Sequence, residues 1–290
     1  MGFFDKIKDM LGAGAGGGLD LAELGRRLDL DPVELQNLPI QYTQFKIPKR
    51  SGGSRTIQAP APELKKIQRT ILRRLLTRLQ VHPCAMAYEK ERSIVTNALP
   101  HLRQHVVVKF DLIDFFPSTK ASRVEEYFRK IGWNREAAKL LTKICTWNGG
   151  LPQGAPTSPK LSNLVNYRLD ALLHSIAIIE GGCYTRYADD ITVSFNDAPR
   201  GKINRVVKLM MHYVKKDYRI HDNKKMQVLK RNRRQIVTGL VVNQQLNLPR
   251  ETRRLLRSVE HRLKKSEPVT LTEQQLAGWN GMLTLISKNR

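Results

Sequence analysis

Residues 184–195 read Tyr-Thr-Arg-Tyr-Ala-Asp-Asp-Ile-Thr-Val-Ser-Phe, a largely apolar pattern with two adjacent acids at its centre. The alternation of apolar residues around Asp189 and Asp190 predicts two strands joined by a tight turn. Adjacent like charges repel, and Asn-Gly or Asp-Gly would make a better turn. A bound divalent cation would remove this conflict, whereas an exposed acidic turn is the alternative interpretation.

A second acid follows an apolar run. Residues 106–111 read Val-Val-Val-Lys-Phe-Asp, which predicts a buried strand that ends at Asp111. An unpaired buried carboxylate is costly, so Asp111 is either the N-cap of the following helix or a metal ligand. Two Mg²⁺ ions about 4 Å apart, held by carboxylates from separate strands, can drive nucleotidyl transfer. The pattern therefore predicts that Asp111, Asp189 and Asp190 are catalytic and bind two magnesium ions.

The order of the other elements fits an α+β domain whose helices cover one face of a sheet. A Gly-rich stretch at 13–18 has the composition of a flexible linker. Beyond it, the patterns predict two short helices in 19–38, a hairpin over 42–57, helices over 63–79 and 122–147, one long helix over 160–179, a helix over 202–218, a strand over 235–242 and a basic helix over 250–265.

The charge balance points to a polyanionic partner. Fifty Lys and Arg residues face 26 Asp and Glu residues, a formal net charge of +24. Such a field favours nucleic acid, although solvated basic faces are the alternative. Neither a membrane-spanning run nor a secretory leader is present, which predicts a cytoplasmic protein without a membrane partner. The residues predicted to contact nucleic-acid phosphates are Lys65, Lys66, Arg69, Arg73, Arg253, Arg254 and Arg257.

Three motifs together carry a family resemblance. Tyr187-Ala188-Asp189-Asp190 resembles the YxDD signature of reverse transcriptases. The stretch 110–118, Phe-Asp-Leu-Ile-Asp-Phe-Phe-Pro-Ser, looks like the first palm motif of that family, and the Pro-Gln-Gly-rich stretch 151–163 is similar to the motif before its long palm helix. The resemblance covers residues 41–285. Asn97-Ala-Leu-Pro-His101 and Val237-Thr-Gly239 are similar to the NAxxH and VTG patterns of the bacterial retron branch.

The resemblance implies the architecture of a right-hand polymerase. In this α+β fold, a palm with an antiparallel sheet and helices on one face is accompanied by fingers and a short helical thumb. The expected boundaries are an N-terminal helical extension over 1–40, fingers over 41–105, a palm with interleaved fingers elements over 106–245, and a thumb over 246–290.

The resemblance also implies roles for further residues at a nucleotide site. Phe116 would lie beneath the sugar and exclude a ribose 2′-hydroxyl, with a core phenylalanine as the alternative. Gln153 and Gly154 would flank the nascent base pair, unless they form an ordinary turn. Arg55 would bind the triphosphate and Lys224 would neutralise the leaving pyrophosphate. Solvated side chains are the alternative for both.

The remaining expectations concern partners. Asn97 and His101 would contact RNA or, as the open alternative, stabilise the backbone. The resemblance implies an RNA template, deoxynucleotides, a DNA product and a noncoding RNA copied into a branched RNA–DNA hybrid, with an effector protein in antiphage defence. Rival hypotheses are another bacterial reverse transcriptase and a non-catalytic RNA-binding scaffold. A general DNA-binding protein would explain the charge but not the three carboxylates.

Overall fold

The structure, a computed structural model, describes residues 5, 7, 18–48, 52–197, 199–221 and 226–289. These residues fall into two compact units, each made of three chain segments. The first comprises Met1–Pro83, Leu112–Ala171 and Tyr213–Arg219, and the second comprises Cys84–Asp111, Leu172–His212 and Ile220–Arg290. Most of the Gly-rich stretch and Lys224 lie outside the described residues. The boundaries of these two units differ from those expected for fingers, palm and thumb. The division into fingers, palm and thumb stays a prediction.

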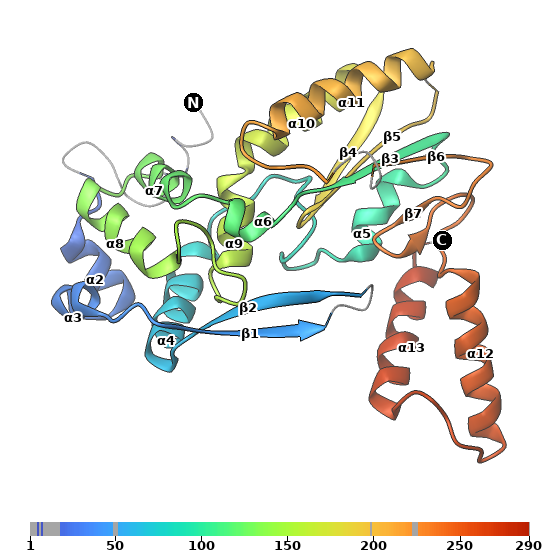
Figure 1. Ribbon diagram of the computed structural model, residues 1–290, viewed down its shortest axis with the longest axis horizontal. Helices are drawn as coiled ribbons and strands as arrows, with labels where there is room; N and C mark the ends of the chain where they lie inside the picture. Colours follow the sequence, from blue (N-terminus) through green and yellow to red (C-terminus); the bar gives the residue numbers. More distant parts are fainter. Residues whose placement is uncertain are drawn as a thin grey trace. The chain divides into compact units, whose positions relative to one another are not determined.

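The first unit combines helices with a two-stranded sheet (Figure 1). Strands β1 (Tyr42–Pro48) and β2 (Ser54–Pro60) form the antiparallel hairpin that the sequence predicts. Side-chain caps begin the two short helices, because Asp20 and Asp31 accept hydrogen bonds from backbone amides in their first turns. The helices of this unit are α2 (Leu21–Leu28), α3 (Pro32–Asn37), α4 (Pro62–Ile71), α6 (Phe115–Ser118), α7 (Ala121–Lys130), α8 (Arg135–Cys145) and α9 (Ser158–Val165).

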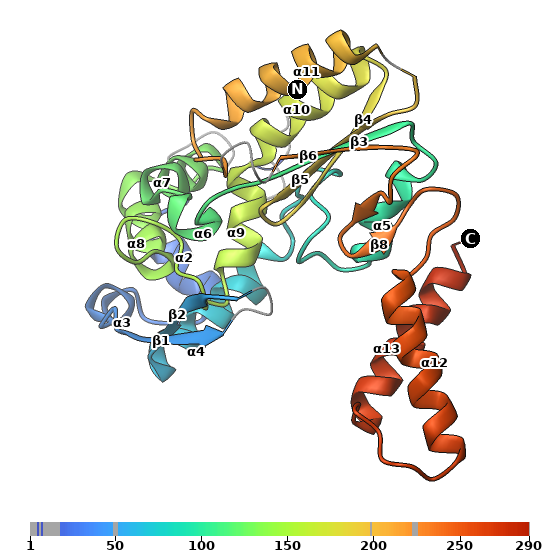
Figure 2. The same cartoon turned by 45° about the vertical axis from the view of Figure 1, so that its right-hand side comes forward.

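The second unit is built on a four-stranded antiparallel sheet with the order β4-β5-β3-β6. Strand β3 is central because it is apolar on both faces: Val106, Val107, Val108 and Phe110 are all buried. Helix α11 and the second half of α10 lie side by side along one face of this sheet (Figures 1 and 2). The bounds are β3 (Val106–Asp111), β4 (Gly182–Tyr187), β5 (Asp190–Phe195), β6 (Gln227–Lys230), α10 (Tyr167–Ile179) and α11 (Arg200–Val214).

A smaller core in the second unit anchors its C-terminal helices. It contains the hairpin of β7 (Ile236–Val237) and β8 (Leu240–Val241), together with α5 (Ile94–Ala98) and the 3₁₀ turn Leu99–His101. Helices α12 (Arg250–Lys264) and α13 (Glu273–Ser287) contribute the buried Leu256 and Ile286 to this core. The two helices run antiparallel beside each other, within the range 246–290 that was expected to form the thumb (Figure 2).

The prediction of one long helix over 160–179 is wrong in one respect, because two helices, α9 and α10, are separated there at Asn166. The Asn166 side-chain amide donates hydrogen bonds to the Ser162 carbonyl and to the Tyr218 hydroxyl. Asparagine side chains that bond nearby backbone compete with the helical ladder. The break therefore follows from a tertiary partner, Tyr218, that a helical pattern does not reveal.

The single strand predicted over 235–242 is also wrong, because β7 and β8 form a hairpin there. Its turn residues, Thr238 and Gly239, have φ values of 44° and 84°. Positive φ at both central residues is the pattern of a type I′ turn. The sequence prediction also omits β6 and α13, and the helix predicted over 63–79 ends in a π-helical turn at Leu72–Leu76. No helix in the described part of the chain is long and apolar enough to cross a membrane.

Candidate active site

Strand register brings the predicted metal ligands together in the second unit. In the antiparallel pair of β3 and β5, Asp111 is the cross-strand partner of Asp190. Directly opposed residues project to the same face of a sheet, with Cβ atoms about 5 Å apart. Asp189 lies in the turn between β4 and β5, immediately before Asp190. The three carboxylates therefore share one end of the sheet.

The turn that carries Asp189 has an unusual backbone. Tyr187 pairs with Asp190, so Ala188 and Asp189 form a two-residue loop. Ala188 has a φ of 57°, which non-glycine residues seldom adopt. Arg186, only 1% exposed, donates a hydrogen bond of 3.1 Å to the Ala188 carbonyl. This buried arginine supports the strained turn, and no role was predicted for it.

The carboxylate of Asp190 is paired with Lys109. Lys109 Nζ lies 3.0 Å from Asp190 Oδ2, and the two side chains are only 18% and 21% exposed. Burial raises the pKa of Asp190, the charge of Lys109 lowers it, and the charges of Asp111 and Asp189 raise it. No role was predicted for Lys109. The signal was present, because a lysine two residues before Asp111 must share its face of β3.

The donor chemistry of this cluster fits magnesium, which prefers carboxylate oxygens. Asp190 Oδ1 is buried without a hydrogen-bond partner, so it could accept a cation. In the described part of the chain, however, no three His, Cys, Asp or Glu side chains converge as a ready metal site. The second oxygen of Asp190, Oδ2, is engaged by the ion pair with Lys109.

His101 lies fully buried against the same sheet. Its Nδ1 is 2.7 Å from Ser194 Oγ on β5, and its Nε2 is 2.8 Å from Thr185 Oγ1 on β4. Burial and then the charge of Lys109 lower the pKa of His101 to about 3. The imidazole is therefore neutral at physiological pH and joins strands β4 and β5.

This burial predicts a specific pH dependence of stability. The unfolded chain binds a proton at His101 near pH 6.5, whereas the folded chain does so only near pH 3. Acid therefore favours unfolding, and stability is lost as the pH falls from 6.5 towards 3. Between pH 7.5 and 5.5 we expect His101 to account for a loss of about 1.4 kcal/mol in unfolding free energy. Urea unfolding of the parent and of His101→Gln at both pH values measures this loss. Equal pH dependence of the unfolding free energy in the two proteins would contradict the prediction.

The two retron-like patterns contact each other. Asn97, 1% exposed, donates from Nδ2 to Thr238 Oγ1 at 3.4 Å, and Thr238 Oγ1 donates to the Ile94 carbonyl at 3.0 Å. The NAxxH helix and the VTG turn therefore form one structural unit, which shares a core with α12 and α13. Burial of Asn97 and His101 favours the structural alternative over contact with nucleic acid.

In the first unit, the Gln153-Gly154 loop is tied to β2. The backbone amide of Gln58 donates to the backbone carbonyl of Gln153 at 2.9 Å, and the backbone amide of Gln153 donates to Gln58 Oε1 at 3.2 Å. Gly154 has a φ of +142°, and a Cβ there would lie 2.6 Å from the Gln58 carbonyl oxygen. The close approach therefore requires glycine. Gln58 was not predicted, since nothing in its neighbourhood distinguishes it from an ordinary strand glutamine.

Two other predicted nucleotide-binding residues, Arg55 and Phe116, lie on separate elements of the first unit. Arg55 is exposed on β2, opposite Ile47 of β1. Phe116 is half-buried on α6, with its ring centroid 5.5 Å from that of Phe115. Their roles stay predictions, as does that of Lys224.

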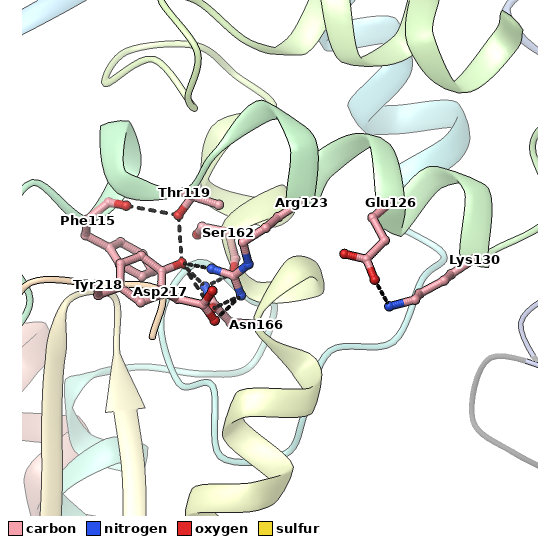
Figure 3. Close-up of polar contacts among 9 residues, drawn as sticks. All are labelled: Phe115, Thr119, Arg123, Glu126, Lys130, Ser162, Asn166, Asp217 and Tyr218. Carbon is pink, nitrogen blue, oxygen red and sulfur yellow. Dashed lines mark hydrogen bonds and ion pairs between the residues drawn. The ribbon is translucent and has the colours of Figure 1, made fainter. Parts of the chain in front are cut away.

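A buried polar network supports the first unit near residues 213–219 (Figure 3). The Tyr218 hydroxyl is 2.8 Å from Thr119 Oγ1 and accepts a hydrogen bond of 3.0 Å from Arg123. Arg123 also donates to Asn166 Oδ1 at 3.0 Å and forms an ion pair with Asp217. These contacts fix the segment through which the chain re-enters this unit.

The predicted phosphate contacts lie on two helical surfaces. Lys65, Lys66, Arg69 and Arg73 border an open hollow of about 660 Å³ beside α4, whose lining includes no acid. Arg253, Arg254 and Arg257 are exposed on α12. Both surfaces have the charge that a nucleic-acid backbone requires.

Known proteins resemble this chain over most of its length. The sequence family described as reverse transcriptase (RNA-dependent DNA polymerase) matches residues 47–267. The retron Mx162 reverse transcriptase of Myxococcus xanthus is 39% identical over 260 residues, covering 78% of this chain and 53% of the relative. The retron Ec86 reverse transcriptase of Escherichia coli is 37% identical over 226 residues, covering 77% of this chain and 70% of the relative. The chain thus spans little more than half the length of the Myxococcus relative.

The fold has a counterpart among solved structures. A telomerase from Candida albicans, solved with a fragment of telomeric RNA, matches 80% of this chain and 51% of its own with a TM-score of 0.52. At 9% identity, this likeness concerns the fold alone. The family match and the retron relatives agree with the strand-borne carboxylates and the two retron-like patterns. The chain therefore belongs to the reverse transcriptase family and to its retron-type members.

Proposed function

We propose that this chain is an RNA-directed DNA polymerase that extends DNA on an RNA template with deoxynucleotides. The observation that carries the proposal is the register of β3 and β5, which sets Asp111 opposite Asp190 beside Asp189. These three residues would hold two Mg²⁺ ions. When bound, the ions would supply activation of the attacking hydroxyl and stabilisation of the leaving pyrophosphate.

Other residues would bind and orient the substrates. The loop at Gln153 and Gly154, held on β2 by Gln58, would place the nascent base pair. The planar guanidinium of Arg55 suits bidentate binding of the triphosphate, and Lys224 would neutralise the leaving pyrophosphate. Phe116 would exclude a ribose 2′-hydroxyl by its bulk, which would favour deoxynucleotides.

The basic surfaces would hold the template and primer. The cations beside α4 and those on α12 would bind phosphates without regard to sequence and with strong dependence on salt. In this proposal α12 and α13 form the thumb, residues 41–105 the fingers and residues 106–245 the palm. Residues 1–40 form the N-terminal helical extension in this proposal.

Similarity to retron enzymes supports a finer proposal about template and product. The chain would copy its own structured noncoding RNA in the cytoplasm, beginning at the 2′-hydroxyl of a guanosine, and give a branched RNA–DNA hybrid. An effector protein would complete a system of antiphage defence. The rival hypotheses are another bacterial reverse transcriptase and a non-catalytic RNA-binding scaffold. An RNA gene with inverted repeats beside the gene for this chain would favour the retron type over another bacterial reverse transcriptase.

Primer extension tests the proposal directly. Purified protein is given a defined RNA template, a primer, deoxynucleotides and Mg²⁺, beside an Asp189→Asn/Asp190→Asn variant. We expect template-dependent DNA from the parent and none from the variant. Absence of DNA from the parent, on this template and on RNA co-purified from the native host, would favour the scaffold instead.

A further inference from the structure

Lys109 lies on an interior strand of the sheet, where a charged side chain is uncommon unless it has a partner. Its cross-strand partners are Thr192 on β5 and Gln227 on β6, so neighbouring strands flank it on both sides. Asp190, two residues from Thr192 on β5, is its diagonal neighbour. The ammonium reaches that carboxylate at 3.0 Å. A lysine in the centre of a sheet is stabilised by such a pairing.

Different groups lie on the two sides of Lys109. Towards the strand ends lie Asp190, its partner Asp111 and the adjacent Asp189. Towards the interior lies His101, which is neutral and bonded to the hydroxyls of Ser194 and Thr185. The cation therefore borders an acidic cluster and an uncharged polar layer.

Three crowded carboxylates repel one another unless a cation is near them. Lys109 supplies one positive charge to this cluster from within the fold. A lysine is suited to this task because its ammonium is a compact charge on a flexible four-carbon stem. The same charge opposes the entry of a divalent ion at Asp190, since two cations near one carboxylate repel each other.

We propose that Lys109 is an internal counter-cation, which neutralises the acidic cluster in the metal-free protein and makes tight divalent-ion binding depend on incoming nucleotide phosphates. The proposal rests on the proposed polymerase function. Magnesium in such sites is commonly held by one or two carboxylates together with substrate phosphates. The triphosphate would add the negative charge that offsets Lys109, so ion and nucleotide would bind cooperatively.

The test measures ion binding rather than catalysis. Mn²⁺, which is paramagnetic, is titrated into the full chain and followed by electron paramagnetic resonance, with and without a deoxynucleoside triphosphate. Lys109→Met removes the charge but keeps a long apolar stem, and Lys109→Arg keeps the charge. Without nucleotide, we expect Lys109→Met to bind Mn²⁺ on the order of tenfold more tightly than the parent. With nucleotide, this difference should shrink, and Lys109→Arg should resemble the parent throughout.

Unchanged or weaker Mn²⁺ binding by Lys109→Met without nucleotide would overturn the proposal, because a lysine that only orients Asp190 predicts that result. Thermal unfolding without metal gives a second readout. Lys109→Met should unfold at a lower temperature than the parent, and adding Asp190→Asn should recover part of that loss; no recovery also counts against the proposal. A parent that binds no Mn²⁺ even with nucleotide would overturn the two-metal polymerase as well, which separates the two failures.

Discussion

Asp111→Asn is expected to lower the rate of primer extension by about a thousandfold or more. The amide keeps the size of the carboxylate but loses its charge, so the cluster with Asp190 and Asp189 would hold divalent ions poorly. A catalytic ion contributes several kcal/mol to stabilising the transition state, and each 1.4 kcal/mol changes the rate about tenfold. Single-turnover extension at saturating nucleotide measures the effect on the chemical step.

Asp114→Asn is the matched control for this variant. Asp114 belongs to the same stretch, but its side chain is 65% exposed and paired with Arg219 at 3.4 Å. Its backbone has a φ of 47°, a conformation that asparagine also adopts readily. We expect its extension rate to stay within about threefold of the parent, since exposed ion pairs contribute little. Equal rates for Asp111→Asn and the parent would remove Asp111 from the catalytic site.

Gly154→Ala is expected to reduce both stability and nucleotide use. The added Cβ would lie 2.6 Å from the Gln58 carbonyl oxygen, and a φ of +142° is strained for any residue with a Cβ. Because both obstacles are backbone features, the loop must leave β2. We expect the free energy of unfolding to fall by about 2–4 kcal/mol. We also expect kcat/KM for deoxynucleotides to fall about a hundredfold, a loss of about 2.7 kcal/mol.

Gly281→Ala provides the same chemical change where it should be harmless. Gly281 lies within α13, and a Cβ there would meet nothing within 4 Å. Alanine should stabilise this helix by about 0.5–1 kcal/mol. Gln58→Ala removes only the side-chain bond to the Gln153 amide and should give a smaller loss than Gly154→Ala. Parental stability and kcat/KM in Gly154→Ala would show that the loop is not held against β2 as described.

Local patterns predicted much of the fold and the three carboxylates. Alternation around Asp189 predicted the hairpin of β4 and β5, and the apolar run before Asp111 predicted β3. The hairpin in 42–57 and the helices of 19–38 and 122–147 are also confirmed. These features succeed because each is specified by residues close together in the sequence.

Features that depend on distant partners were not predicted. The pairing of Lys109 with Asp190 and the bond from Gln58 to the Gln153 loop join separate segments, as does the strand register that sets Asp111 opposite Asp190. The sequence predicted that these two aspartates meet, but not the register that brings them together. Burial is such a feature too, because the NAxxH pattern did not reveal whether His101 faces solvent or the sheet. Its contacts with Ser194 and Thr185 decide that question.

The central place of β3 has a consequence for how the chain is made. Its neighbour β5 is encoded about 80 residues later and its other neighbour, β6, later still. A nascent chain that has left the ribosome only as far as residue 180 carries an apolar strand with both edges unpaired, the kind of segment that associates with other chains. Both edges of β3 are covered only after residue 230 has emerged. We therefore expect the yield of folded protein to depend on chaperone protection, or on rapid elongation, during this interval.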